Sequence, residues 1–147
     1  MCGRYTITQD LAELEKLVRF SCKVVDFKPR YNLAPSQVAV IIRADPSGNR
    51  TFLNALWGLI PTGARVTEDL SRPVNAKAET AAIEPRFRNA FRQRRILVPA
   101  DAFYEWKKID GQKQPFLIHM KDGAPLASRG CSSSGRDPRA KWQHLQS

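Results

Sequence analysis

The first three residues, Met1, Cys2 and Gly3, carry a potentially reactive arrangement. If Met1 is removed, Cys2 presents an α-amine and a thiol on one residue, which together form a 1,2-aminothiol. Both groups are partly nucleophilic near neutral pH. Residues 4–7 are typical of a strand, which would hold Cys2 against the body of the protein. The alternative is that Cys2 is an ordinary second residue with no chemical role.

Glu105 is a second candidate for chemistry, because it lies between Tyr104 and Trp106. A carboxyl group desolvated by such neighbours would be suited to proton transfer. On the outer face of a hairpin, however, it would be only a surface carboxylate paired with Lys107. The residues themselves leave both interpretations open.

Asn75 is a third candidate, since its segment, residues 73–80, contains small residues that would let a backbone or ligand approach closely. The alternative is an asparagine that caps a turn. Neither His119 nor His144 has a neighbour that marks it as a base. The sequence shows no Ser-His-Asp pattern, phosphate-binding loop or metal cluster.

The elements that would position these residues fit into one domain, because 147 residues suffice for a single core. A hydrophobic content of 42% argues against global disorder. No apolar run approaches the roughly 20 residues that cross a bilayer, and the N-terminus lacks a signal-peptide pattern. We therefore predict a cytoplasmic or nucleoid-associated protein. The spacing of Cys2, Cys22 and Cys131 suggests neither disulfides nor a zinc site, so no cofactor or metal is implied.

The charge balance is strongly basic, with 24 Lys and Arg against 14 Asp and Glu, a net charge of +10. A basic balance of this size is typical of proteins that bind polyanions. The end of the chain adds little to it, since residues 128–147 hold four of the basic side chains. The alternative is a solvated basic surface without a partner.

Apolar periodicity predicts mainly strands. The expected strands are residues 4–7, 38–42, 51–59, 74–78, 95–99, 103–106 and 115–118. Residues 45–49 form a turn between the second and third of these, and Asp110-Gly111 joins the last two into a hairpin. Residues 61–73 are expected to be a surface loop, and the chain beyond Ala127 reads as disordered.

Two helices are expected. The first is capped by Thr8 and carries an apolar stripe at helical spacing. The members of the stripe are Leu11, Leu14, Leu17 and Val18. The second is a short helix over residues 83–92, which exposes Arg86, Arg88 and Arg92.

Five ordered motifs make residues 1–127 resemble the SOS-response-associated peptidase (SRAP) family, the abasic-site processing proteins. The motifs are residues 1–5, 30–35, 57–61, 75–80 and 99–106. The resemblance implies an α+β, β-rich fold with a mixed, barrel-like sheet and a few short helices. Cys2, Asn75 and Glu105 match positions of these motifs, which favours their functional interpretations.

The resemblance also implies a use for the aminothiol in the DNA damage (SOS) response. Family members remove their own Met1 and bind single-stranded DNA that carries an abasic site. The Cys2 amine condenses with the sugar aldehyde and the thiol then closes a thiazolidine, a covalent crosslink that shields the lesion. By resemblance Glu105 assists proton transfer, and Asn75 positions the amine and the sugar.

The same resemblance implies DNA contacts. Arg4 and Lys77 would hold phosphates, and Pro35 would wedge against the bases beside the lesion. Asn32 and Arg86 complete the predicted DNA-binding set. The family usually has arginine at the position of Lys77, and lysine keeps the charge but loses the bidentate fork. A monomer is expected.

The sequence departs from the family pattern in two ways. No tryptophan occurs in residues 61–65, where family members carry stacking tryptophans, and no His-x-Arg-x-Pro motif occurs at all. We therefore expect a SRAP domain over residues 1–127, lacking its C-terminal part, and a non-family tail over 128–147. A frameshift near Ala127 is one hypothesis for this end. Open strand edges and weak or absent crosslinking are expected to follow.

Two other functions remain open at this point. Cys2 could be the nucleophile of a cysteine peptidase or amidohydrolase that acts on a peptide or amide. Alternatively, the basic chain could bind single-stranded DNA without forming a covalent bond.

Overall fold

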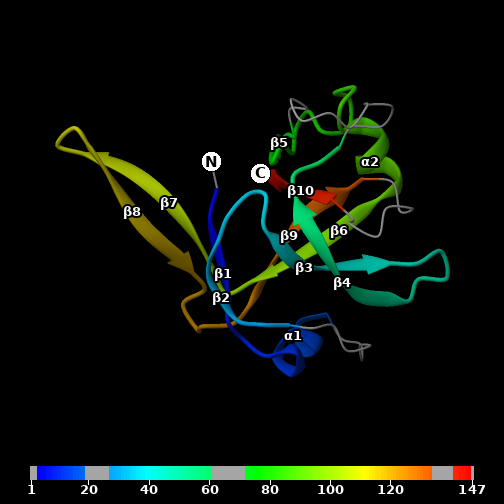
Figure 1. The fold of residues 1–147 in the computed structure, drawn as a ribbon, viewed down its shortest axis with the longest axis horizontal. Helices are drawn as coiled ribbons and strands as arrows, with labels where there is room; N and C mark the ends of the chain where they lie inside the picture. Colours follow the sequence, from blue (N-terminus) through cyan, green and yellow to red (C-terminus); the bar gives the residue numbers. More distant parts are fainter. Residues whose placement is uncertain (1–2, 19–26, 61–71, 134–140, 147) are drawn as a thin grey trace.

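The computed structural model describes residues 3–18, 27–60, 72–133 and 141–146. Within these ranges two short helices accompany strands that form two sheets (Figure 1). One sheet has four strands in the order β2-β1-β7-β8, and the other has six in the order β4-β3-β6-β9-β10-β5. The predicted β-rich α+β fold is confirmed, although the strands form two sheets rather than one closed barrel.

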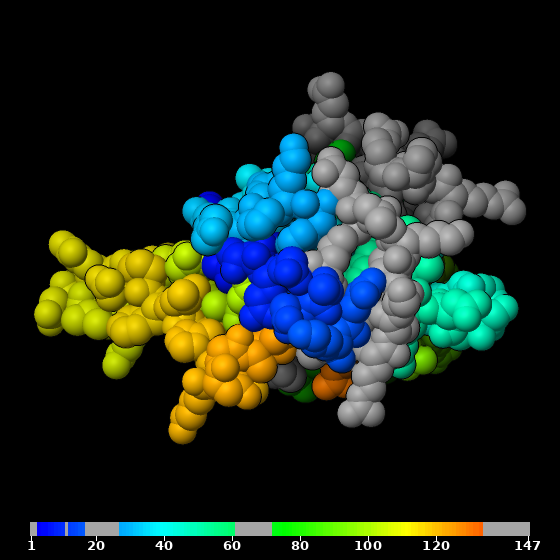
Figure 2. All heavy atoms as spheres, turned by 90° about the horizontal axis from the view of Figure 1, so that it is seen from below, coloured from blue at the N-terminus to red at the C-terminus, as the bar shows by residue number. Residues whose placement is uncertain are grey.

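The four-stranded sheet is antiparallel throughout. Its strands are β1 (Tyr5–Ile7), β2 (Arg30–Leu33), β7 (Ala102–Ile109) and β8 (Gln112–His119). The predicted hairpin is confirmed, because Phe103 pairs with Ile118 and Trp106 with Pro115. Its turn uses positive φ at Asp110 and Gly111, 47° and 82°. The hairpin, drawn in yellow tones in Figures 1 and 2, projects from the body of the molecule.

The six-stranded sheet is mixed. Its strands are β3 (Val38–Ala44), β4 (Arg50–Trp57), β5 (Asn75–Lys77), β6 (Arg95–Ala100), β9 (Leu126–Ser132) and β10 (Lys141–Gln146). The predicted turn joins β3 to β4, where the Asp45 carboxylate accepts a hydrogen bond from the Asn49 backbone at 2.9 Å. Strand β10 pairs antiparallel with β9 but parallel with β5 and β4.

The first helix, α1 (Leu11–Val18), is not capped by Thr8 as predicted. Its N-terminus is capped by Asp10, whose Oδ1 accepts a hydrogen bond from the backbone N–H of Glu13 at 2.9 Å. Thr8 instead donates from its backbone N–H and its hydroxyl to Oδ2 of Asp101, the hydroxyl at 2.7 Å. Asp10 directly precedes the helix and takes the cap position, while Thr8 makes a contact between positions far apart in the chain.

The second helix, α2 (Arg88–Gln93), is shorter than the predicted helix over residues 83–92. Residues 78–87 form turns before it begins. Pro85 lies within the predicted span and disfavours helical backbone angles at the residue before it, Glu84, which gives a physical reason for the late start.

The disorder predicted beyond Ala127 is wrong where the structure describes the chain. Residues 128–132 belong to β9, and residues 141–146 form β10. Strand β9 pairs with β6 from Ala100↔Leu126 to Arg95↔Cys131, so backbone pairing orders a segment whose side chains show no apolar period. The boundary expected after Ala127 therefore falls inside β9. Residues 134–140 lie outside the described ranges, as do residues 61–71 of the predicted loop.

The core has two parts. The larger lies between β1, α1 and the six-stranded sheet, with Tyr5, Leu14 and Trp57 among its buried members. The smaller joins α2 to the end of the sheet through Ala76, Phe87, Cys131 and other side chains. Within the described residues, no helix is both long and apolar enough to span a membrane.

Candidate functional site

Cys2, the predicted nucleophile, lies outside the described residues. The strand that follows it is fixed against β7, because Tyr5 pairs with Phe103 and the Arg4 carbonyl accepts a hydrogen bond from the Tyr104 N–H at 2.9 Å. Continuing this antiparallel register by two residues brings Gly3 opposite Glu105. Glu105 therefore lies on the strand that pairs with β1, close to the point where the described chain begins.

Glu105 itself is half-buried on β7, opposite Phe116 of β8. Alternation along the strand puts its side chain on the same face as that of Phe103. Tyr104 points the other way, and its hydroxyl donates to the Tyr31 carbonyl of β2 at 3.3 Å. The carboxylate is thus neither on the exposed tip of the hairpin nor fully enclosed.

Asn75 is connected to the start of the chain through an aromatic pair. The rings of Tyr5 and Trp57 lie 5.5 Å apart between centroids, at an angle of 59°, and both residues are buried. The Trp57 indole N–H donates to the carbonyl of Val74 at 2.9 Å, directly before Asn75. We call Tyr5 and Trp57 the aromatic hub, because this pair connects β1 to the residue directly before β5.

Strand β5 divides its residues between two faces. Ala76 is buried in the smaller part of the core, whereas Asn75 is half-buried and Lys77 is exposed. Because side chains alternate along a strand, Asn75 and Lys77 project from the same face. Two of the predicted site residues are therefore brought together by local geometry.

Arg4 and Asn32 are brought together by tertiary structure. Arg4 Nη1 donates to Asn32 Oδ1 at 3.0 Å, which joins the residue before β1 to a side chain of β2. Both residues are exposed, and so is Tyr31, the residue directly before Asn32. The pair offers a guanidinium and an amide to solvent beside the root of β7.

Pro35 lies in a turn that is tied to the aromatic hub. The next residue, Ser36, has a φ of 65° and donates its backbone N–H to the Trp57 carbonyl at 2.9 Å. The Gln37 side chain accepts from the Ala34 N–H at 3.1 Å and closes the turn. Pro35 is half-buried and held near the end of β4.

Arg86 differs from the other predicted site residues, because its described contacts are local. Its guanidinium binds the Glu84 carboxylate at 2.7 Å and lies 5.5 Å from the centroid of the Phe87 ring. The structure does not join it to Asn75 or Glu105 by a described contact.

The aromatic hub is a feature of the candidate site for which the sequence analysis predicted no role. Trp57 stood in a matched motif, and Tyr5 followed the predicted nucleophile, but neither was given a task. The sequence signal that could have identified Tyr5 and Trp57 is that each is an aromatic residue in a family motif and lies at the end of a strand. Among the described residues, no cluster of three His, Cys, Asp or Glu side chains could hold a metal ion.

Comparison with known proteins identifies relatives along nearly the whole chain. A family model described as "SOS response associated peptidase (SRAP)" matches residues 1–146, a range that continues past Ala127. Two Bacillus subtilis proteins, the abasic site processing proteins YoaM and YobE, are 39% and 38% identical to it. These matches cover 88% and 99% of this chain but only 58% and 64% of the relatives, so the chain spans about three fifths of their length.

Solved structures show the same fold. A phage-related protein from Bordetella bronchiseptica has a TM-score of 0.79 at 27% identity, over 98% of this chain and 68% of that one. A second protein from the same organism has a TM-score of 0.78 at 25% identity, with coverage of 98% and 71%. With the family model, the relatives and the fold in agreement, this chain belongs to the SOS response associated peptidase (SRAP) family.

Proposed function

We propose that this chain processes abasic sites in single-stranded DNA and does so by forming a covalent bond through Cys2. The names of its relatives support abasic-site processing. The observation that carries the rest is the aromatic hub. Tyr5 pairs with Phe103 on the strand of Glu105, and its ring packs on Trp57, whose indole N–H binds the carbonyl of Val74, directly before Asn75. These contacts support a site between the strand of Glu105 and Asn75.

The proposed reaction begins with removal of Met1, which frees the Cys2 amine. The amine attacks the aldehyde of the ring-opened sugar and water leaves, which gives an imine. The thiol then adds across the C=N bond: sulfur bonds to carbon, and the thiol proton is transferred to nitrogen. The product is a thiazolidine ring. Because both nucleophiles belong to one residue, the second step is intramolecular and strongly favoured.

Glu105 would transfer protons during sugar opening and imine formation, since its half-buried carboxylate lies on the strand beside Gly3. Asn75 would position the amine and the sugar by hydrogen bonds from its amide. Both roles are proposals that rest on the placement of these side chains around the aromatic hub.

The DNA strand would be held by exposed groups around the site. Arg4, paired with Asn32, and Lys77, on the face of Asn75, would contact phosphates. Pro35 would support the bases beside the lesion, and Arg86 would add a more distant positive charge. Association with the nucleoid would follow from such contacts.

The test is a denaturing gel after incubation with single-stranded DNA that contains one abasic site. We expect a shifted band that is absent in Cys2→Ala. Glu105→Gln should slow its formation by on the order of a hundredfold or more, the usual contribution of acid–base catalysis. Glu13→Gln, which removes an exposed carboxylate from α1, is the matched control and should react at the normal rate.

Intact mass before the reaction must show that Met1 is gone. Because the sequence has no His-x-Arg-x-Pro motif, we expect the band to form slowly and to stay weak. A band that persists in Cys2→Ala would contradict the proposal, and so would a lack of any band from protein with a free Cys2. Turnover of an amide without DNA would favour the hydrolase instead.

A further inference from the structure

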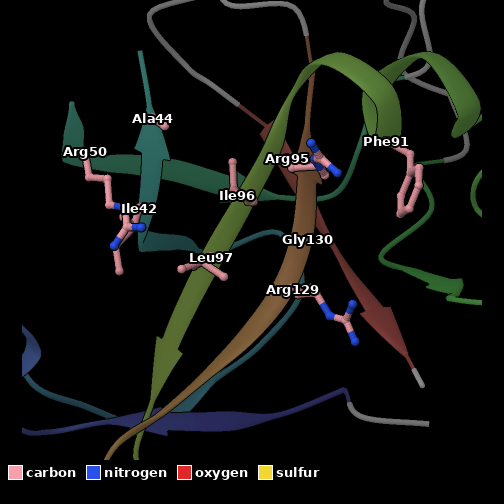
Figure 3. A pocket seen from close by; sticks show the side chains of 9 residues that line it. All are labelled: Ile42, Ala44, Arg50, Phe91, Arg95, Ile96, Leu97, Arg129 and Gly130. Atoms are coloured by element: carbon pink, nitrogen blue, oxygen red, sulfur yellow. The ribbon is translucent and has the colours of Figure 1, made fainter. Parts of the chain in front are cut away.

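A second basic feature lies away from the predicted site. It is an open groove of about 250 Å³ on the six-stranded sheet, next to α2 (Figure 3). We call it the arginine groove. Its lining residues are Ile42, Ala44, Arg50, Phe91, Arg95, Ile96, Leu97, Arg129 and Gly130. Three of them are arginines and none is acidic, so the groove has a positive rim around an apolar floor.

Strand register explains why the arginines gather there. Leu97 pairs with both Ile42 and Arg129, which makes a continuous row across β3, β6 and β9. Arg95 pairs with Cys131, so Arg95 and Arg129 are diagonal neighbours, about 7–8 Å apart at the backbone. Figure 3 shows Arg50 beside Ile42, on one side of Leu97, and shows Arg95 and Arg129 on the other side of Leu97.

The arginine groove and the predicted site occupy different faces of the sheet. Pairing of Cys131 with Gln143 and of Ala76 with Leu145 places Arg129 and Ala76 in one row across β9, β10 and β5. Asn75 and Lys77 flank Ala76 and therefore project from the opposite face. A ligand in the groove does not compete for the space around Asn75.

The chemistry of the groove selects its occupant. Guanidinium groups bind phosphate oxygens through two parallel hydrogen bonds, and Leu97 and Phe91 offer apolar surface to a base or sugar. A volume of about 250 Å³ is below that of pockets that enclose a whole small molecule, roughly 300–1,000 Å³. An open groove of this size suits a segment of a longer chain that enters and leaves.

We propose that the arginine groove binds the sugar–phosphate backbone of single-stranded DNA as a second contact, remote from the lesion. The proposal deepens the proposed function and rests on it only for the choice of DNA among polyanions. The net charge of +10 supports a polyanionic partner. The second contact would keep a long strand bound while the chemistry occurs on the other face.

The test measures binding of a fluorescent, undamaged single-stranded oligonucleotide as a function of salt. Replacement of Arg50, Arg95 and Arg129 by Ala should weaken binding at least about tenfold at low salt. It should also reduce the slope of log affinity against log salt by roughly 2, since each lost phosphate contact contributes about 0.7. The matched control replaces three exposed lysines of the β7–β8 hairpin, Lys107, Lys108 and Lys113, by Ala.

The proposal predicts a clearly smaller loss of affinity when the three hairpin lysines are replaced by Ala. It predicts near-normal binding when Arg50, Arg95 and Arg129 are replaced by Lys, and that result would also show that the groove still folds. Equal losses in the arginine and lysine variants would overturn it, because net charge alone would then explain binding. Equal competition by poly-glutamate would overturn DNA as the occupant and indicate an acidic protein.

Failure of this inference can be told apart from failure of the proposed function. Binding of undamaged DNA needs no thiol, so Cys2→Ala should bind normally if the groove is the contact. Conversely, the triple arginine variant at saturating DNA should still crosslink an abasic site. An unchanged slope of log affinity against log salt in that variant would overturn the proposed groove contact and leave the proposed crosslink through Cys2 unaffected.

Discussion

The aromatic hub and the β7–β8 hairpin are both built from aromatic residues on strands, yet they differ in how they are held. Tyr5 and Trp57 are 4% and 1% exposed, whereas Trp106 and Phe116 are 41% and 43% exposed. The hub is fixed by packing between segments far apart in sequence, and the hairpin by a local turn and strand pairing. Substitutions should therefore act on global stability in the hub and locally in the hairpin.

The largest expected difference comes from the two tryptophans. Trp57→Ala removes a buried ring and its hydrogen bond to Val74, and we expect a loss of about 3–5 kcal/mol in the free energy of unfolding. Trp106→Ala should lose less than about 1 kcal/mol, because the ring is partly in solvent. Urea denaturation of both variants measures this, and similar losses would remove the distinction between the regions.

Two glycines sharpen the comparison on the backbone. Gly58 has a φ of 140°, and an added Cβ would lie 3.3 Å from Cβ of Arg72, so Gly58→Ala should cost about 2–3 kcal/mol. Gly111, at 82° in the hairpin turn, has nothing within 4 Å, so Gly111→Ala should cost about 1–2 kcal/mol. Thermal unfolding should rank Gly58→Ala as the less stable; the reverse order would contradict the packing argument.

Two aspartates compare a long-range contact with a turn. Asp101 binds the backbone and hydroxyl of Thr8, so Asp101→Ala should cost about 2 kcal/mol and loosen the junction of β1 and β7. Asp110→Ala changes only the hairpin turn and should cost less than about 1 kcal/mol. Amide hydrogen exchange would show whether protection at Thr6 and Thr8 is lost in the first variant and kept in the second.

The smallest expected effect is at the root of the hairpin. Tyr104→Phe removes the hydroxyl that donates to the Tyr31 carbonyl at 3.3 Å. The bond is long and exposed, so we expect at most about 0.5 kcal/mol. A larger loss in the free energy of unfolding, measured by chemical denaturation, would mean that this exposed hydrogen bond stabilises the four-stranded sheet more than its length and exposure indicate.

Much of the fold was predictable because the signals are local. The Asp110-Gly111 turn set the register of β7 and β8, and the apolar run around Val40 and Ile41 marked a buried strand. Prediction failed where distant contacts decided between local options. Asp10 caps α1 while Thr8 binds Asp101, and β9 is ordered by pairing with β6 despite a polar sequence.

The candidate site was predictable to a different degree. Motif resemblance named Cys2, Asn75 and Glu105, and their chemistry stays a prediction for the experiments above. The resemblance did not reveal how the segments of Asn75 and Glu105 are connected. The ring contact of Tyr5 with Trp57 and the indole hydrogen bond to Val74 join distant segments, so no periodicity within a single strand indicates them.

By itself, the sequence determined the strand-rich character, the hairpin, the basic charge and the family, since periodicity, turn chemistry, composition and ordered motifs are properties of the chain alone. Only the tertiary structure decided which faces these strands present. It joined Tyr5 to Trp57, paired Arg4 with Asn32 and gathered Arg50, Arg95 and Arg129 in one groove. The physical reason is that strand register across a sheet sets such neighbours, and distant backbone partners fix that register.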